Sequence, residues 1–118
     1  MALQNYRSLN VWKRAMELVI TAYEVCKKLP QEERFGLSSQ IQRAAVSIPA
    51  NIAEGYGRTH RGDYLRHLSM AMGSLSELET LLILIVKLKA VGRNDVVKGW
   101  GISQEVGKML RKLISSLK

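Results

Sequence analysis

The sequence has little of several residue types on which particular classes of protein depend. Its single cysteine, Cys26, excludes an internal disulfide and a cysteine-rich zinc site, and it fits a buried thiol in a reducing compartment. Aromatic residues make up 6% of the chain and there are two prolines, a composition that favours helices over a sheet. The longest apolar run, Leu81 to Val86, is too short to cross a bilayer, and the N-terminus lacks the apolar segment of a signal peptide. We therefore expect a cytoplasmic protein without a membrane partner.

Acidic residues are scarce relative to basic ones. Eighteen Lys and Arg against ten Asp and Glu give a formal net charge of +8 in a chain of 118 residues. The excess is uneven, because residues 98–118 contain five Lys or Arg and only one Glu. On a domain of this size, such a balance favours an anionic partner such as RNA or DNA. Nucleotide hydrolysis is not indicated, since no phosphate-binding glycine loop follows a strand-like segment.

Apolar residues recur at spacings of three and four over four segments, which is the periodicity of helices with one buried side. Pro30, Gly55, Gly57 and Gly92 lie where the connections are expected, and Asn94 is the predicted cap of the last helix. Short connections place consecutive helices antiparallel. The sequence therefore predicts one domain over residues 1–118, an all-α, up-down-up-down four-helix bundle with helices at approximately residues 9–29, 37–55, 60–91 and 95–117.

The third predicted helix carries more apolar surface than one bundle can bury. From Leu81 to Val86 it is apolar on every side, a pattern typical of helices inside a structure. In a monomeric bundle, one side of each helix faces water, and a large exposed apolar patch usually marks an interface. We therefore expect the protein to form a homo-oligomer.

The second predicted helix has two unusual features, an interior proline and a line of polar residues. Pro49 removes a backbone hydrogen bond and costs roughly 3 kcal/mol unless its surroundings compensate. We interpret the polar line as a network at a helix or subunit interface, in which Asn51 and Glu54 satisfy groups left open near Pro49. A ligand or RNA contact and a solvated face are the alternatives. Six residues at spacings of three and four form this line: Gln40, Arg43, Ser47, Asn51, Glu54 and Arg58.

Three stretches resemble a bacterial family of four-helix bundle proteins encoded by intervening sequences in 23S ribosomal RNA genes. They are Leu9 to Ala15, Leu29 to Arg58 and Ala71 to Thr80, and the twelve residues from Ser47 to Arg58 are the most specific. The resemblance implies a four-helix bundle that forms ring-shaped homo-oligomers, typically pentamers, with no established reaction and no cofactor. Related bundles act as accessory factors of reverse transcriptases and contact nucleic acid there, which makes a role beside a mobile or intervening element the expected one.

Six basic residues are the candidates for contacts with phosphates. Lys and Arg side chains that neutralise phosphates supply most non-specific affinity for nucleic acid. Because few aromatic residues are free to stack on bases, we expect backbone binding and not sequence-specific recognition of single strands. A solvated, solubilising surface is the alternative role. The six residues are Arg58, Arg61, Arg66, Lys108, Arg111 and Lys112.

The start of the third predicted helix raises two further hypotheses. His60, Asp63 and His67 share one side of it, but diiron bundles need a carboxylate on each of two helices and two Glu-x-x-His pairs, which this chain lacks. We therefore expect no metal. Arg61 and His67 have the spacing of the arginine–histidine pair in HEPN ribonucleases, although Gly62 departs from that pattern.

The sequence thus favours a non-enzymatic homo-oligomer that binds RNA or DNA backbone, with no catalytic residue, cofactor or small-molecule substrate. A metal-independent ribonuclease that uses Arg61 and His67 is the first alternative. A structural oligomer with an unknown protein partner is the second.

Overall fold

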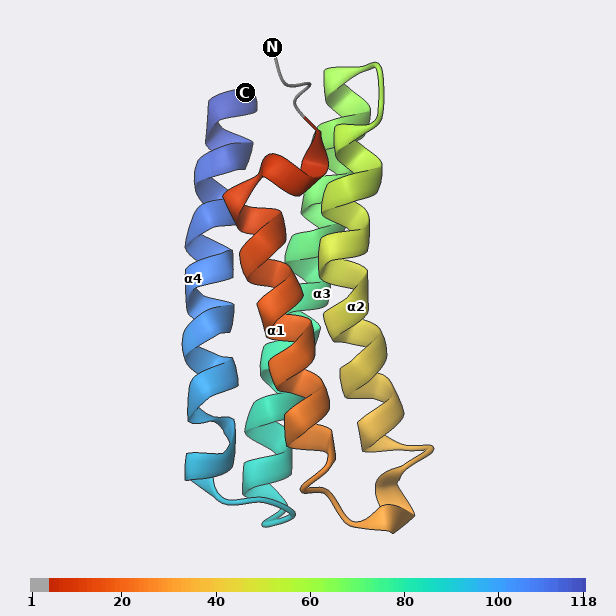
Figure 1. Ribbon diagram of the computed structural model, residues 1–118, viewed down its shortest axis with the longest axis vertical. Coiled ribbons are helices and arrows are strands. Elements are labelled where there is room, and N and C mark those ends of the chain that lie inside the picture. Colours follow the sequence, from red (N-terminus) through yellow and green to blue (C-terminus); the bar gives the residue numbers. More distant parts are fainter. Residues whose placement is uncertain (1–4) are drawn as a thin grey trace.

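The computed structural model describes residues 5–118 as four long helices that lie side by side (Figure 1). Successive helices run in opposite directions, and the described residues include no strand, which confirms the predicted all-α, antiparallel bundle. Single-turn 3₁₀ helices at Tyr6–Ser8 (η1) and Gln31–Glu33 (η2) flank the first helix. The four helices are α1 Asn10–Cys26, α2 Leu37–Tyr56, α3 Arg61–Lys87 and α4 Arg93–Leu117.

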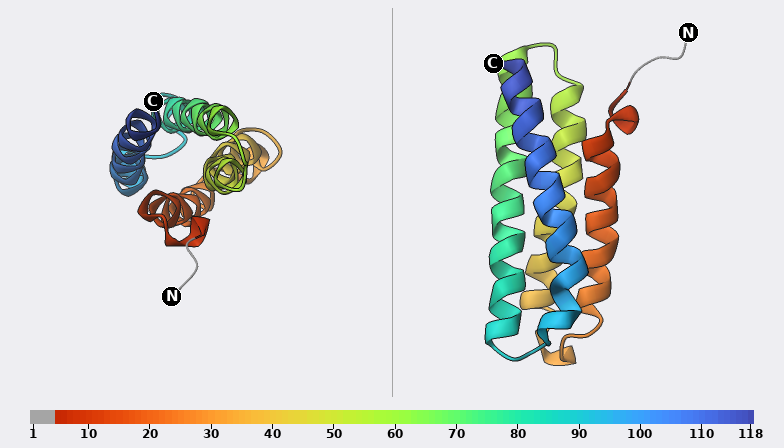
Figure 2. Two further views of the ribbon diagram at one scale, coloured as in Figure 1. Left: turned by 90° about the horizontal axis from the view of Figure 1, so that it is seen from above. Right: turned by 90° about the vertical axis from the view of Figure 1, so that its left-hand side faces the viewer.

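Each helix packs on two neighbours around a central core. Seen from above, α1 and α3 occupy opposite corners, and each contacts both α2 and α4 (Figure 2). The alternating spacings of four and three in α3 place one stripe of side chains in the core, as the sequence predicts. That stripe is fully or almost fully buried: Leu68, Ala71, Leu75, Leu78, Leu82 and Ile85.

The helix boundaries differ from the predicted ones by more than one residue at three places. The first helix ends at Cys26 and not at residue 29, because the residue before Pro30 is sterically biased away from the helical conformation. The third ends at Lys87 and not at residue 91, and Lys89 adopts a left-handed conformation (φ 61°) that ends it. The fourth begins at Arg93, two residues earlier than predicted.

The prediction that Asn94 caps α4 is wrong. The cap is Gly92, whose backbone N–H donates to the Asp95 carboxylate at 2.8 Å. A carboxylate at the third helical position reaches back to the cap residue, as in a capping box. Here this contact sets the start of the helix at Arg93, two residues before Asp95.

The apolar segment of α3 is buried on one side only. Leu81, Leu82 and Ile85 are buried, whereas Ile83 is 45% and Leu84 is 37% exposed. By length and composition α3 could cross a membrane, with a mean hydropathy of 1.5 over its most apolar window. The core helix of a bundle meets the same criterion, and α3 packs against both α2 and α4.

Candidate functional site

The helices α2 and α3 approach each other closely at Gly55. A Cβ atom placed on Gly55 would lie 2.6 Å from Cβ of His67 and 3.1 Å from Cδ1 of Tyr64. The sequence predicts that Gly55 ends the second helix, but the helix continues to Tyr56 and Gly55 is buried within it. Its missing side chain is what allows α3 to pack this close.

The His67 side chain lies in this contact between α2 and α3. It is 3% exposed, and its Nδ1 atom is 3.1 Å from Oδ1 of Asn51. The Asn51 amide donates to the Ser47 carbonyl at 2.8 Å, which turns Oδ1 toward the imidazole ring. Nδ1 is therefore the donor in the bond to Asn51, and Nε2 is buried without a partner among the described residues. The contact fixes both the tautomer and the orientation of His67.

The predicted polar line divides into a packed part and an exposed part. Ser47 shares a hydrogen bond between hydroxyl groups with Ser74 of α3, next to the pair of Asn51 and His67. Glu54 lies at the edge, with a carboxylate oxygen 3.9 Å from Nδ1 of His67 and another 3.9 Å from Nη2 of Arg58.

Gln40, Arg43 and Arg58 are exposed, and Arg43 makes a bond of 3.4 Å to Ser39 within α2. Asn51 bonds the Ser47 carbonyl, not the Ala45 carbonyl that Pro49 leaves without its helical donor. The line therefore serves contact between helices in its middle, at Ser47 and Asn51, and faces solvent at both ends.

The structure separates the two residues of the ribonuclease hypothesis. Arg61 is exposed at the start of α3, whereas the His67 ring is enclosed by α2. A nuclease pair must reach the same phosphate, and a side chain that is 3% exposed does not reach one. His60 is exposed, and no group of three potential metal ligands occurs among residues 5–118.

The six candidate phosphate contacts lie in one half of the bundle, from the turn between α2 and α3 down to the level of Lys108 near the middle of α4, and we call this half the basic end. The end of α2, the start of α3 and the last turns of α4 meet there, at the top of Figure 1. Five of the six have no carboxylate within 4.0 Å among the described residues, and the sixth, Arg58, has only the pair with Glu54 at 3.9 Å. All six are exposed: Arg58, Arg61, Arg66, Lys108, Arg111 and Lys112.

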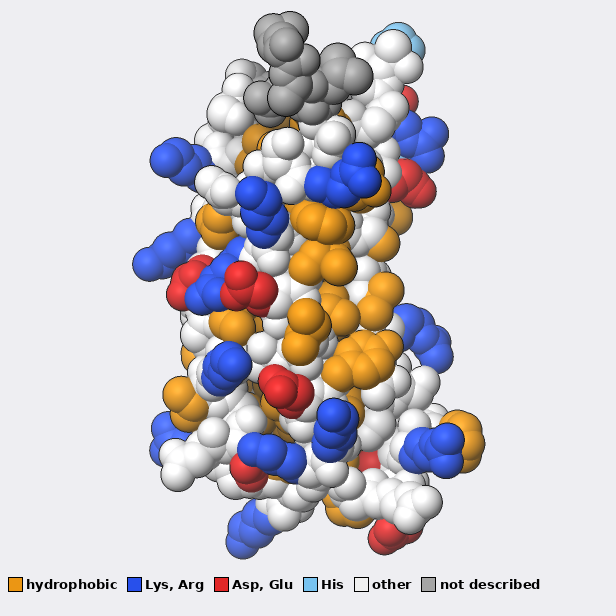
Figure 3. Space-filling view, in the orientation of Figure 1, with side chains coloured by type: hydrophobic (Ala, Val, Ile, Leu, Met, Phe, Trp, Pro, Cys, Tyr) orange, Lys and Arg blue, Asp and Glu red, His pale blue; other side chains and the backbone are white. Residues whose placement is uncertain are grey.

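Two basic residues outside the basic end, Arg14 and Lys28, have a carboxylate within 4.0 Å among the described residues, which the sequence could not show. Arg14 of α1 donates to Glu105 of α4 at 2.7 Å and also pairs with Glu17. The bond from Arg14 lowers the pKa of Glu105 and raises that of Arg14. Lys28 pairs with Asp95 at 3.1 Å. The charges of the basic end lack such partners apart from Arg58, and Figure 3 shows Lys and Arg side chains over both the upper and the lower half of this face.

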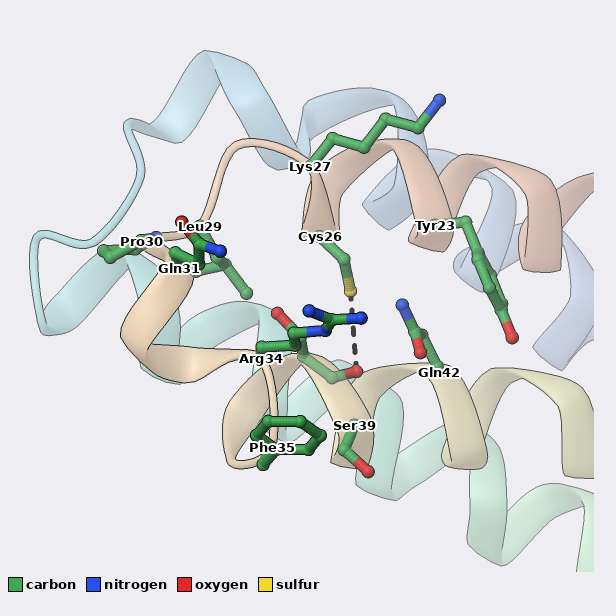
Figure 4. Close-up of a pocket in the computed structure, with 11 residues that line it drawn as sticks. Tyr23, Cys26, Lys27, Leu29, Pro30, Gln31, Arg34, Phe35, Ser39 and Gln42 are labelled. Atoms are coloured by element: carbon green, nitrogen blue, oxygen red, sulfur yellow. Dashed lines mark hydrogen bonds between the residues drawn. The ribbon is translucent and has the colours of Figure 1, made fainter.

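A hollow of about 650 Å³ lies at the opposite end, between the end of α1 and the start of α2 (Figure 4). Cys26 reaches into it and donates to the Ser38 carbonyl at 3.6 Å. Burial raises the pKa of the Cys26 thiol, which disfavours the reactive thiolate form. Around it are mixed polar and apolar side chains, among them Tyr23, Arg34 and Phe35. This chemistry indicates a structural thiol and not a nucleophile.

Comparisons with known proteins agree with this architecture. A family model described as 23S rRNA-intervening sequence protein matches residues 7–112. The chain is similar to the crystal structure of a protein of unknown function from the S23 ribosomal protein family of Bacteroides thetaiotaomicron. The two are 28% identical with a TM-score of 0.81, over 88% of this chain and 97% of the other. A search of the curated proteins finds no match.

Proposed function

The chain belongs to the family of 23S rRNA-intervening sequence proteins, since the family model matches residues 7–112. On this basis we propose that it is a self-associating bundle that binds the RNA or DNA backbone through its basic end. The proposed role is non-catalytic, as an accessory factor of a mobile or intervening element. The observation that carries it is the group of six exposed Lys and Arg side chains in one half of the bundle, only one of which has a carboxylate within 4.0 Å among the described residues.

Unpaired cations suit phosphates because binding releases counterions from the nucleic acid. Each neutralised phosphate contributes about −0.7 to the slope of log affinity against log salt for single strands, and about −0.9 for duplex DNA. Six contacts therefore correspond to a slope of roughly −4 on single-stranded RNA. A cation already paired with a carboxylate, such as Arg14, gains less from a phosphate because it must first give up its partner.

Self-association strengthens such binding without any new kind of contact. Exposed apolar side chains on α1, α3 and α4, among them Ile20, Ile83 and Val97, supply surface for it. If several copies present their basic ends to one strand, the second and later contacts become intramolecular, and the overall affinity exceeds that of a single copy. This favours long nucleic acids over short ones.

The test compares two triple variants that change the net charge equally. Reversal of Lys108, Arg111 and Lys112 to Glu removes half of the proposed contacts, so we expect affinity for mixed-sequence RNA to fall at least about 100-fold at low salt. The control reverses Lys27, Arg34 and Lys89 at the opposite end, where only a small, long-range loss is expected. Fluorescence anisotropy with labelled RNA measures both.

Three outcomes would contradict the proposal. They are the absence of binding by the wild type at low salt, an equal loss in both triple variants, and a scattering mass of 13.3 kDa at micromolar concentration. The first two would reject the basic end as the binding surface. The third would reject self-association and leave the nucleic-acid part standing.

A further inference from the structure

The hollow between the end of α1 and the start of α2 has the size of a small-molecule site. Its volume of about 650 Å³ falls within the range of roughly 300–1,000 Å³ that is usual for such sites. Cys26, Leu29 and Ser38 are buried and form its floor, and its walls come from α1, η2, α2 and the loops between them. We call it the α1–α2 pocket (Figure 4). A single chain forms it without a contribution from a second copy.

The charged side chains that line the α1–α2 pocket have one sign. They are Lys27 and Arg34, and neither has a carboxylate within 4.0 Å among the described residues. Cys26 adds no negative charge, because burial raises the pKa of its thiol and favours the protonated form. The pocket therefore favours a ligand that carries negative charge.

The acidic side chains that are nearest in the sequence do not line the α1–α2 pocket. A carboxylate oxygen of Glu33 accepts from the first backbone N–H of α2 at 3.4 Å. Glu24 lines a different hollow, between α1 and α4, and Glu32 is exposed on η2. A further cation stands beside the pocket, since Arg43 donates to the Ser39 hydroxyl at 3.4 Å. The balance of charge around the pocket thus remains positive.

Arg34 is the cation that reaches into the α1–α2 pocket. Figure 4 shows its guanidinium group in the space between α1 and α2, whereas Lys27 points away from this space. Gln42 extends its amide into the same space from α2. A guanidinium group is planar and can bond two oxygens of one phosphate at once, and an amide offers both a donor and an acceptor. These two side chains can therefore hold a phosphate and a group with mixed hydrogen bonding.

Two aromatic side chains complete the α1–α2 pocket. Phe35 is 88% exposed and Tyr23 is 42% exposed. The Phe35 ring centroid lies 5.5 Å from Cζ of Arg34, so an apolar ring and a cation stand side by side. A planar ring that stacks on Phe35 would remove its apolar surface from water, and every nucleobase has a face suited to such stacking.

We propose that the α1–α2 pocket binds a free nucleoside monophosphate, a small ligand that joins a phosphate to a planar ring. Arg34 holds the phosphate, Phe35 stacks on the base, and Gln42 bonds the edge of the base. A phosphate monoester carries a charge of about −2 at neutral pH, which the two basic lining residues match. A triphosphate would exceed the positive charge that these side chains supply.

The position of the α1–α2 pocket separates it from the proposed nucleic-acid surface. The pocket lies where α1 ends and α2 begins, in the half of the bundle opposite the basic end (Figure 1). The longest extent of the molecule is 47 Å. A strand held at the basic end therefore does not place a nucleotide in the pocket by the same contacts. For this reason the inference concerns a free nucleotide and goes beyond the proposed function.

Titration with 5′-AMP, followed by the NMR chemical shifts of backbone amides, tests this inference. We expect saturable shifts that centre on the end of α1 and the start of α2. Adenosine lacks the phosphate and inorganic phosphate lacks the ring, so each should bind at least about 10-fold more weakly than 5′-AMP.

Three variants assign the two halves of the ligand to their residues. Arg34→Gln should weaken 5′-AMP binding at least about 10-fold, because it removes the charged donor. Arg34→Lys keeps the charge without the planar group and should recover only part of the loss. Phe35→Leu keeps an apolar side chain without a stacking face and should weaken binding roughly 5-fold or more.

Arg93→Gln is the matched control. Arg93 is exposed at the start of α4, at the same end of the bundle, and it does not line the α1–α2 pocket. The variant loses the same charge as Arg34→Gln and should bind 5′-AMP as the wild type does. A cooperative urea transition in each variant establishes that it is folded.

Three outcomes overturn the nucleotide site. They are the absence of saturable shifts at the α1–α2 pocket, an equal loss of affinity in Arg34→Gln and Arg93→Gln, and inorganic phosphate that binds as tightly as 5′-AMP. The last result would reduce the site to a general attraction for anions.

A final comparison separates this inference from the proposed function. The reversal of Lys108, Arg111 and Lys112 to Glu should leave 5′-AMP binding unchanged, so the failure of either proposal leaves the other standing. Saturating 5′-AMP should leave the affinity for labelled RNA unchanged. If 5′-AMP displaced the RNA, the pocket would belong to the strand-binding surface, and its assignment to a free nucleotide would be wrong.

Discussion

Replacement of Gly55 by Ala tests the close approach of α2 and α3. The added methyl group would lie 2.6 Å from Cβ of His67, whereas carbon atoms in contact are normally 3.5–4.0 Å apart. The atom it meets is bonded directly to the backbone of α3 and is not the flexible tip of a side chain. To relieve the overlap, the two helices must separate by roughly 1 Å.

Two effects of opposite sign decide the result. Ala is favoured over Gly inside a helix by about 0.5–1 kcal/mol. Overpacking of a tight contact costs about 1–3 kcal/mol, and here helix separation also strains the hydrogen bond between His67 and Asn51. We expect overpacking to dominate, so the free energy of unfolding falls by about 0.5–2 kcal/mol.

Urea unfolding followed by circular dichroism measures the change, with Gly73→Ala as the control. Gly73 is also in a helix, but a Cβ there meets nothing within 4 Å, so only the propensity gain remains. Gly73→Ala should therefore stabilise the protein by about 0.5–1 kcal/mol. If Gly55→Ala stabilised the protein as much as Gly73→Ala, the account of Gly55 as a required close contact would be refuted.

Two further predictions concern hydrogen bonds at helix contacts and caps. Asn51→Ala should lower the free energy of unfolding by about 1–3 kcal/mol, because it leaves the buried Nδ1–H of His67 without its acceptor. Urea unfolding measures the change. An unchanged free energy of unfolding would show that the Glu54 carboxylate replaces the Asn51 amide as the acceptor. Hydrogen bonds from the Gly92 N–H and from Lys28 lower the pKa of Asp95 below its ordinary value of 3.8. The ionised carboxylate therefore stabilises the fold at pH values above 3.8, and this stabilisation disappears as the pH falls through the lowered pKa. Asp95→Ala should therefore be less stable than the wild type at pH 7, with the difference shrinking below about pH 4, and a difference independent of pH would contradict this assignment.

Periodicity alone predicted which residues form the core. The stripe from Leu68 to Ile85 could be identified because a helix with 3.6 residues per turn brings side chains at spacings of three and four to one side. The ends were less predictable, because they depend on local hydrogen bonds. Asp95 bonds the Gly92 amide and sets the start of α4, whereas the sequence offered Asn94 as an equally good cap.

Contacts between helices could not be predicted from the sequence, because they depend on how the helices are aligned in space. Gly55 was expected to end a helix, and its role as the point where α3 packs on α2 appears only once His67 is placed beside it. The same holds for the charges. Arg14 and Glu105 are 91 positions apart in the chain, so the sequence could not show that they bond and that this basic residue is neutralised.

The salt dependence of binding is the most direct test of the claim that the basic end binds a nucleic-acid backbone. Affinity for mixed-sequence RNA is measured at several salt concentrations, for the wild type and for the reversal of Lys108, Arg111 and Lys112 to Glu. If the six side chains of the basic end contact phosphates, log affinity should fall against log salt with a slope of about −4 or steeper. The variant should bind more weakly, with a slope flatter by about 2. A slope that the three substitutions leave unchanged would contradict the account.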